Sequence, residues 1–165
     1  MMKKVIILVI MSFLAFPVYG QKQSKEEKEA AGKALYEMAK QCVEQKSFVI
    51  IPATYGGEME YNNDNSNFFS AEGANFFAQG NMVCGNGYTN ILEATDYDAT
   101  FNKKGQMTLK IVVKGRMMNG TYIITMRNNT NEADVIFTPQ NGTVRKFTGP
   151  IMPLTTPYNK RSNPM

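Results

Sequence analysis

The second half of the sequence alternates apolar and polar residues between short turns, and this pattern limits the folds available to the chain. Every second residue from 107 to 113 is apolar, and residues 133–137 repeat the alternation. Successive side chains of a strand point to opposite faces, so the spacing predicts strands with one apolar face. Asn119-Gly120 and Asn141-Gly142 separate such segments, and both residue types tolerate the positive φ of tight hairpin turns. Consecutive hairpins of this kind predict an antiparallel meander.

Shorter strand-like segments precede this meander. Residues 47–53 are β-branched and aromatic, and Pro52 limits that strand or places it at an edge. Two aromatic runs, 67–70 and 75–78, are joined by a link that suits a hairpin. Residues 55–67, rich in Gly, Asn and Asp, are expected to form a loop. With the strand expected at residues 91–102, we predict about seven or eight short strands.

One amphipathic helix is predicted ahead of the strands, over residues 25–45. Ser24 and Glu27 have the spacing of a capping box. Apolar residues recur at helical spacing and form one stripe, which consists of Ala31, Leu35, Met38 and Cys42 and is widened by Ala34 and Val43. A sheet with one apolar face needs a cover, so the favoured fold class is α+β, with the helix packed on an antiparallel meander sheet. The alternative is a small β-barrel with a helix plug.

The first twenty residues have the layout of a secretory signal peptide. Lys3 and Lys4 precede an apolar run at residues 5–16, and Pro17 ends this run before a few small residues. The run is shorter than the roughly 20 residues that a membrane-spanning helix needs. No cysteine stands at the cleavage region, so a lipoprotein anchor is not expected. The segment predicts a periplasmic or secreted protein.

The remaining chain has a suitable length for one folded unit. We expect a signal peptide at residues 1–20, a single α+β domain at residues 21–154 and an extended C-terminal tail at residues 155–165. No apolar stretch after the signal peptide is long enough to cross a bilayer, so no transmembrane segment is expected after cleavage.

Charge and residue types exclude several classes of function. The 18 Lys and Arg residues exceed the 14 Asp and Glu only slightly once the two lysines of the leader are removed, so no nucleic-acid partner is expected. Basic pairs such as Arg145-Lys146 are typical of residues that flank turns. The absence of histidine removes the commonest general base and transition-metal ligand. We therefore expect no catalytic residues, no cofactor and no metal site.

The two cysteines, Cys42 and Cys84, are candidates for a disulfide because the chain is expected to be exported. Closing this loop would stabilise the fold by about 4 kcal/mol in the chain-entropy model. The alternative is two free thiols, with Cys42 a small core residue on the helix. A nucleophilic Cys84 is disfavoured because the chain offers no histidine to activate it.

Adjacent aromatic residues and a cluster of carboxylates are the other candidate sites. Phe68-Phe69 and Phe76-Phe77 are neighbours on expected strands, so one ring of each pair must face away from the core. These rings are either covered by the loop or the tail, or they form an exposed binding surface together with Tyr88.

The densest acidic cluster is formed by Glu93, Asp96 and Asp98. Such a cluster could serve glycoside hydrolysis or hold calcium, whereas its plainer interpretation is a solvated strand face.

The order of these segments resembles the Domain of Unknown Function 4251 family of exported Bacteroidetes proteins. The resemblance covers residues 26–154 and includes the segments "KALYEMAKQCVEQKSFVI", "DYDATFNKKGQMTLKIVVKG", "TYIITMRNN" and "FTGPIMPL". It implies an envelope location and a compact α+β domain, but no activity, and neither cysteine is a family feature. We expect a non-enzymatic domain that binds a protein or glycan of the cell envelope. The alternatives are a structural or accessory envelope protein and a carboxylate-dependent hydrolase.

Overall fold

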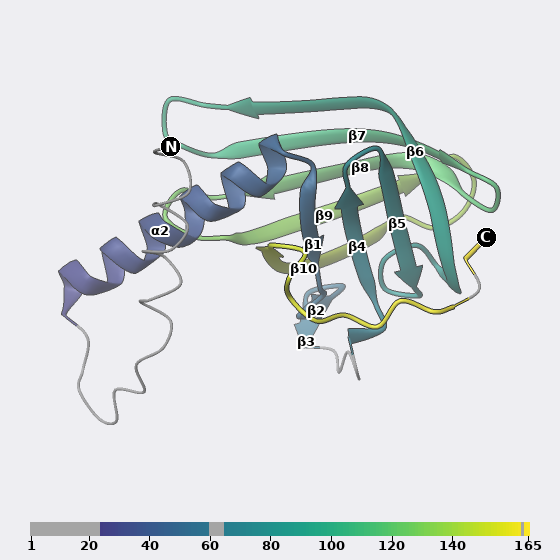
Figure 1. Cartoon of the computed structure of the whole chain (residues 1–165), viewed down its shortest axis with the longest axis horizontal. Coiled ribbons are helices and arrows are strands. Elements are labelled where there is room, and N and C mark those ends of the chain that lie inside the picture. Colours follow the sequence, from purple (N-terminus) through teal and green to yellow (C-terminus); the bar gives the residue numbers. More distant parts are fainter. Residues whose placement is uncertain (1–23, 60–64, 163) are drawn as a thin grey trace.

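The computed structural model describes residues 24–59, 65–162 and 164–165, and the predicted signal peptide lies outside these ranges. One helix, α2 (Lys25–Glu44), precedes all the strands (Figure 1). The strands that follow are β1 (Ser47–Ile50), β2 (Thr54–Tyr55), β3 (Glu58–Met59), β4 (Phe68–Glu72), β5 (Asn75–Gly80), β6 (Asn86–Phe101), β7 (Met107–Gly115), β8 (Asn119–Met126), β9 (Glu132–Pro139) and β10 (Arg145–Met152). The short hairpin β2–β3 lies where the sequence predicted only a loop.

The sheet closes on itself because its first strand, β1, pairs on both edges. From β4 to β10 each strand pairs antiparallel with the next, and β1 pairs with both β4 and β10. The result is a closed eight-stranded antiparallel barrel, to which β2 and β3 add a short extension beside β10. The predicted helix and antiparallel meander are confirmed, and of the two arrangements left open the chain adopts the barrel with a helix plug.

Alternate residues of the strands fill the barrel with an apolar core that has a cluster of aromatic rings. The ring of Tyr122 lies 4.3 Å from that of Phe69 and 4.4 Å from that of Phe137, measured between centroids. Phe48 and Phe76 flank Phe69 at 6.2 and 6.3 Å. All five side chains are fully or almost fully buried. Rings of this size provide most of the apolar area that holds a small barrel together.

The helix covers one end of the barrel, and the face that it buries is rotated away from the predicted apolar stripe. It begins with the predicted capping box, in which Ser24 and Glu27 each satisfy the other's backbone N–H. Its buried residues are Tyr36, Ala39 and Val43, of which only Val43 belongs to the predicted stripe, and Leu35 of that stripe is 38% exposed.

Two contacts with residues far away in the sequence explain this rotation. A Cβ on Gly32 would lie only 2.4 Å from the carbonyl oxygen of Asn129, so the absent side chain lets the helix approach the β8–β9 turn closely. The Tyr97 hydroxyl then donates to the Val43 carbonyl, 2.6 Å away, and fixes the other end of the helix. One contact comes from a turn and the other from a strand, both far from the helix in sequence, so the spacing of apolar residues within the helix could not predict them. No helix of the described part of the chain is long and apolar enough to span a membrane.

Candidate binding site at the loop end of the barrel

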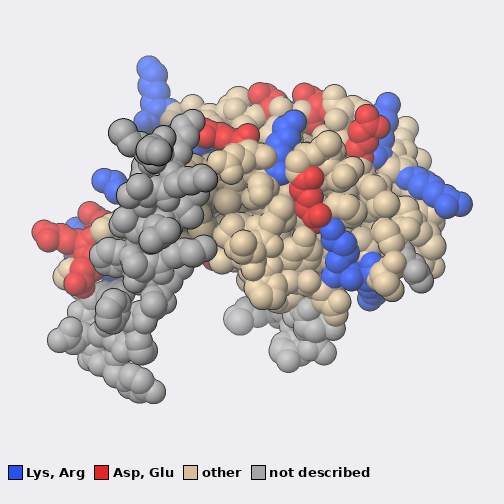
Figure 2. All heavy atoms as spheres, viewed as in Figure 1, with Lys and Arg blue, Asp and Glu red and all other residues tan. Residues whose placement is uncertain are grey.

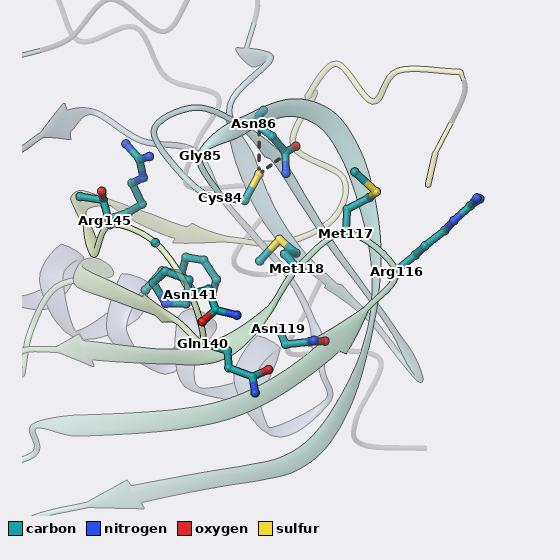
Figure 3. A pocket seen from close by; sticks show the side chains of 14 residues that line it. Cys84, Gly85, Asn86, Arg116, Met117, Met118, Asn119, Gln140, Asn141 and Arg145 are labelled. Carbon is teal, nitrogen blue, oxygen red and sulfur yellow. Dashed lines mark hydrogen bonds between the residues drawn. The ribbon is translucent and has the colours of Figure 1, made fainter.

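The barrel end opposite the helix is formed by three loops, which connect β5 to β6, β7 to β8 and β9 to β10 (Figure 3). Its floor is closed by the protein itself, because Val83 and Met118 are buried and the Tyr122 hydroxyl donates to the Val83 carbonyl at 3.2 Å. The two ends of the barrel therefore differ. A helix covers one end, while loops surround a shallow depression at the other.

A concavity of about 360 Å³ lies between these loops. It is rich in side chains that donate hydrogen bonds, and the described residues that line it include no Asp or Glu. The lining residues are Cys84, Gly85, Asn86, Arg116, Met117, Met118, Asn119, Phe137, Pro139, Gln140, Asn141, Gly142, Thr143 and Arg145. Two guanidinium groups without a carboxylate make this end of the barrel locally positive, although acidic and basic residues are interspersed on the face in Figure 2.

Arg145 is held in place at the wall of the concavity. Its Nη1 donates to the hydroxyl of Tyr55, 2.7 Å away. A Cβ on Gly85 would lie 2.8 Å from Nη2 of the same guanidinium, and Gly85 has a φ of +79°. The positive φ favours glycine there, and an added Cβ would have to push the guanidinium aside. The other cation, Arg116, extends away from the loops in Figure 3, next to Met117, which is 52% exposed.

The thiol of Cys84 lies beside this concavity but is not poised for reaction. It donates to the Gly80 carbonyl at 3.3 Å and accepts from the Asn90 amide at 3.4 Å. Burial raises the pKa of Cys84 to about 11, despite the opposing influence of backbone hydrogen bonds and of Arg145. A thiol with this pKa is protonated at neutral pH, so Cys84 is not an activated nucleophile.

The candidate disulfide is not formed in the structure. Cys42 lies on the helix at one end of the barrel and Cys84 in the loops at the other, and both are free thiols. Cys42 packs partly buried against the core, and burial raises its pKa as well.

Two free thiols have a direct chemical consequence. We expect the unreduced protein, denatured and treated with iodoacetamide, to gain two alkyl groups by mass spectrometry. In the folded protein at pH 8, Cys84 should react far more slowly than a free thiol, because only about 0.1% of it is thiolate when its pKa is about 11. Recovery of an unalkylated chain carrying an intact Cys42–Cys84 bond would contradict the structure.

The aromatic surface proposed from the sequence is mostly buried. Phe69 and Phe76 point into the core, and Phe68 is fully buried on the outer face because the segment after β10 covers it. Phe77 lies under the Lys160 ammonium, 3.5 Å from the ring centroid. Only Tyr88 is well exposed, at 48%. Of the two alternatives, the exposed surface is therefore wrong for the buried rings. Phe69 and Phe76 lie in the core, and the tail covers Phe68 and Phe77, as the other alternative allowed.

The acidic cluster forms a solvated strand face. Asp96 pairs with Lys110 at 3.1 Å, and both side chains are about half exposed. Glu93 and Asp98 are also exposed on β6. Among the described residues, no group of three or more Cys, Asp or Glu side chains could hold a metal ion.

Sequence reasoning missed the cations at the loop end. In the sequence, Arg145 belonged to a pair typical of turns, and no sequence pattern pointed to Arg116 as a site residue. The Asn-Gly turns at residues 119–120 and 141–142 were the available clue, because they predicted where loops would lie. They did not predict that these two loops meet the β5–β6 loop.

Comparisons with known proteins give a fold and no activity. The sequence matches no protein-family profile and no curated protein. The structure, in contrast, is similar to a solved DUF4251 family protein from Bacteroides eggerthii DSM 20697, with a TM-score of 0.65 over 77% of this chain and 93% of that chain. This chain has the DUF4251 fold. The two sequences are 19% identical, and the match supports the family resemblance seen in the sequence. The DUF4251 match indicates no enzyme family.

Proposed function

We propose that this protein is an exported, non-enzymatic binding domain of the cell envelope that takes a small acidic sugar at the loop end of its barrel. One observation carries the proposal: Arg145 and four amide side chains line the concavity, Arg116 lies at its rim and extends outward, and the described lining contains no carboxylate. Guanidinium groups bind carboxylates through charge-assisted, often bidentate hydrogen bonds. The amides of Asn86, Asn119, Gln140 and Asn141 both donate and accept, as the hydroxyls of a sugar require.

The size and rigidity of the site also suit a small ligand. A volume of about 360 Å³ falls within the usual range of small-molecule sites, which is about 300–1,000 Å³. The hydrogen bond from Arg145 to Tyr55 holds its guanidinium before a ligand arrives, which lowers the entropy cost of binding.

The chemistry of the lining residues favours binding over catalysis. The only thiol at the site, Cys84, has a pKa of about 11 and is protonated. The carboxylates that a hydrolase would need, Asp96 and Asp98, lie exposed on the middle of β6 and not in this concavity. Export rests on the predicted signal peptide at residues 1–20, which precedes the described part of the chain.

Calorimetric titration of the purified protein with galacturonate, and with galactose as its neutral analogue, tests the proposal. We expect galacturonate to bind at least about tenfold more tightly, because a hydrogen bond to a charged group is worth about 1.5–3 kcal/mol. Arg145→Gln should weaken galacturonate binding by a similar factor and leave galactose unchanged.

The matched control is Lys103→Gln, which removes one positive charge from the β6–β7 turn at the helix end. This variant should bind both sugars as the unmodified protein does. Equal affinities for the two sugars, or equal losses in Arg145→Gln and Lys103→Gln, would refute the proposed site.

A further inference from the structure

The segment after β10, here called the tail (residues 153–165), runs extended along the outside of β4, β5 and β6 (Figure 1). Among its described residues, a single backbone hydrogen bond is internal, from Thr156 N to the Pro153 carbonyl. Its other backbone–backbone hydrogen bonds are made with residues outside the tail, namely Asn65, Thr89 and Ile91. The tail is thus bound to the barrel surface as a peptide would be, through contacts that do not depend on any fold of its own.

The first contact is an aromatic anchor. The ring of Tyr158 lies 4.7 Å from that of Phe68, whose side chain is fully buried on this outer face. The Tyr158 hydroxyl donates to Oε1 of Glu72 at 2.8 Å. An apolar ring beside a carboxylate acceptor selects an aromatic residue with a polar tip.

The second contact recognises a lysine two residues later. Nζ of Lys160 donates to the same Glu72 oxygen at 2.6 Å and lies over the ring of Phe77 at 3.5 Å. Burial raises the pKa of Glu72, but hydrogen bonds from Lys160, Tyr158 and Ser70 outweigh it and hold this pKa below its usual value. The carboxylate therefore stays ionised, and both partners of the ion pair are largely shielded from water.

The third contact consists of hydrogen bonds to the backbone of the tail, which do not depend on its side chains. The buried amide of Gln79 donates to the Asn159 carbonyl at 2.7 Å and accepts from the Arg161 N–H at 2.9 Å. It thereby makes the pair of hydrogen bonds that a neighbouring strand would make. The Thr89 hydroxyl and the Ser66 carbonyl hydrogen-bond to the same Gln79 amide from the barrel side. The barrel therefore fixes the orientation of this amide.

The fourth contact uses an open sheet edge. The start of β6 pairs with β5, whereas pairing with β7 begins only at Leu92. At this edge Met165 N–H donates to the Thr89 carbonyl and the Met165 carbonyl accepts from Ile91 N–H, both at 2.8 Å. Residue 165 therefore bonds to β6 as the beginning of an added parallel strand, which is the way sheets commonly capture extended peptides.

We propose that this outer face of β4–β6 is a peptide-docking groove, filled in cis by the tail. In trans it takes an extended segment with the same chemistry: an aromatic residue followed two positions later by a lysine. Glu72, Phe68 and Phe77 give the groove its specificity, and Gln79 with the β6 edge binds any backbone. Because the tail already fills the groove, a partner segment binds by displacing it.

The test starts from the folded full chain and cuts its covalent link afterwards. A protease site is inserted between Thr155 and Thr156, the protein is cleaved, and gel filtration shows whether the tail stays bound. We expect it to co-elute with the barrel and to exchange with a fluorescent synthetic peptide of residues 155–165, followed by anisotropy. Peptides carrying Tyr158→Ala or Lys160→Gln should compete at least tenfold less well, and the Ser162→Ala peptide should compete normally.

Circular dichroism of the cleaved protein separates loss of the peptide from loss of the fold. Release of the tail from a barrel that stays folded would overturn the proposal, as would equal competition by all four peptides. A barrel that unfolds on cleavage would also overturn it, since the tail would then be part of the core structure. If the uncut chain dimerises by exchanging tails but takes up no peptide, the occupant is a second copy, which again overturns the proposal.

Discussion

Replacing Phe69 with alanine is expected to lower the free energy of unfolding by about 4 kcal/mol, within the range of 3–5 that is typical for a buried Phe→Ala change. The side chain is fully buried, and its ring lies 4.3 Å from that of Tyr122 and near the rings of Phe48 and Phe76. Its removal leaves a cavity among large rings that cannot collapse without moving strands of a closed barrel.

Urea unfolding followed by circular dichroism measures this loss. The matched control is Phe101→Ala, because Phe101 is 38% exposed near the end of β6 and contacts the Lys40 ammonium at 5.1 Å. We expect the control to lose less than about 1 kcal/mol. Similar losses in the two variants would show that Phe69 is not at the centre of the core.

Gly149→Ala is expected to destabilise the barrel by about 3 kcal/mol, at the upper end of overpacking effects. Gly149 lies on β10, and a Cβ there would be 2.3 Å from the Ile51 carbonyl oxygen and 3.0 Å from its carbon. Both atoms are backbone, so they cannot rotate away. The clash falls beside the pairing of β1 with β10, which closes the barrel.

Hydrogen exchange shows which strands are destabilised as well as by how much. In Gly149→Ala we expect the amides of β1 and β10 to exchange faster relative to those of β7 and β8. The reason is that the pairing of β1 with β10 should open before the hairpins of the meander unfold. Gly87→Ala is the control, since the nearest atom to its new Cβ is the flexible end of Arg161, 3.1 Å away. Equal destabilisation of the two variants would contradict a barrel closed at Gly149.

The meander could be predicted from sequence because its information is local. Apolar alternation and the Asn-Gly pairs specify hairpins between neighbouring segments, and these hairpins are present. Closure was only one of two expectations, because it depends on Val49 facing Met152 across most of the chain. The alternation of apolar residues cannot predict a pairing between strands so far apart in the sequence. The rotated helix face likewise depends on Gly32 fitting against a distant turn.

The candidate site was harder to predict than the fold. Period-two alternation places one ring of each aromatic pair outside the sheet, and the sequence left open whether these rings are covered or exposed. It did not reveal that Tyr158 covers Phe68 and Lys160 covers Phe77. Arg145 looked like an ordinary turn residue until Gly85 and Tyr55 were found beside it. In each case the decisive partner is far away in the sequence.

If the loop end of the barrel binds an acidic ligand, the amide chemical shifts of its three loops must change during a galacturonate titration. We expect saturable shifts confined to residues 84–86, 116–119 and 140–145, and their loss in Arg145→Gln. Shifts centred on the helix or on the tail, or no saturable shifts in these three loops, would contradict it.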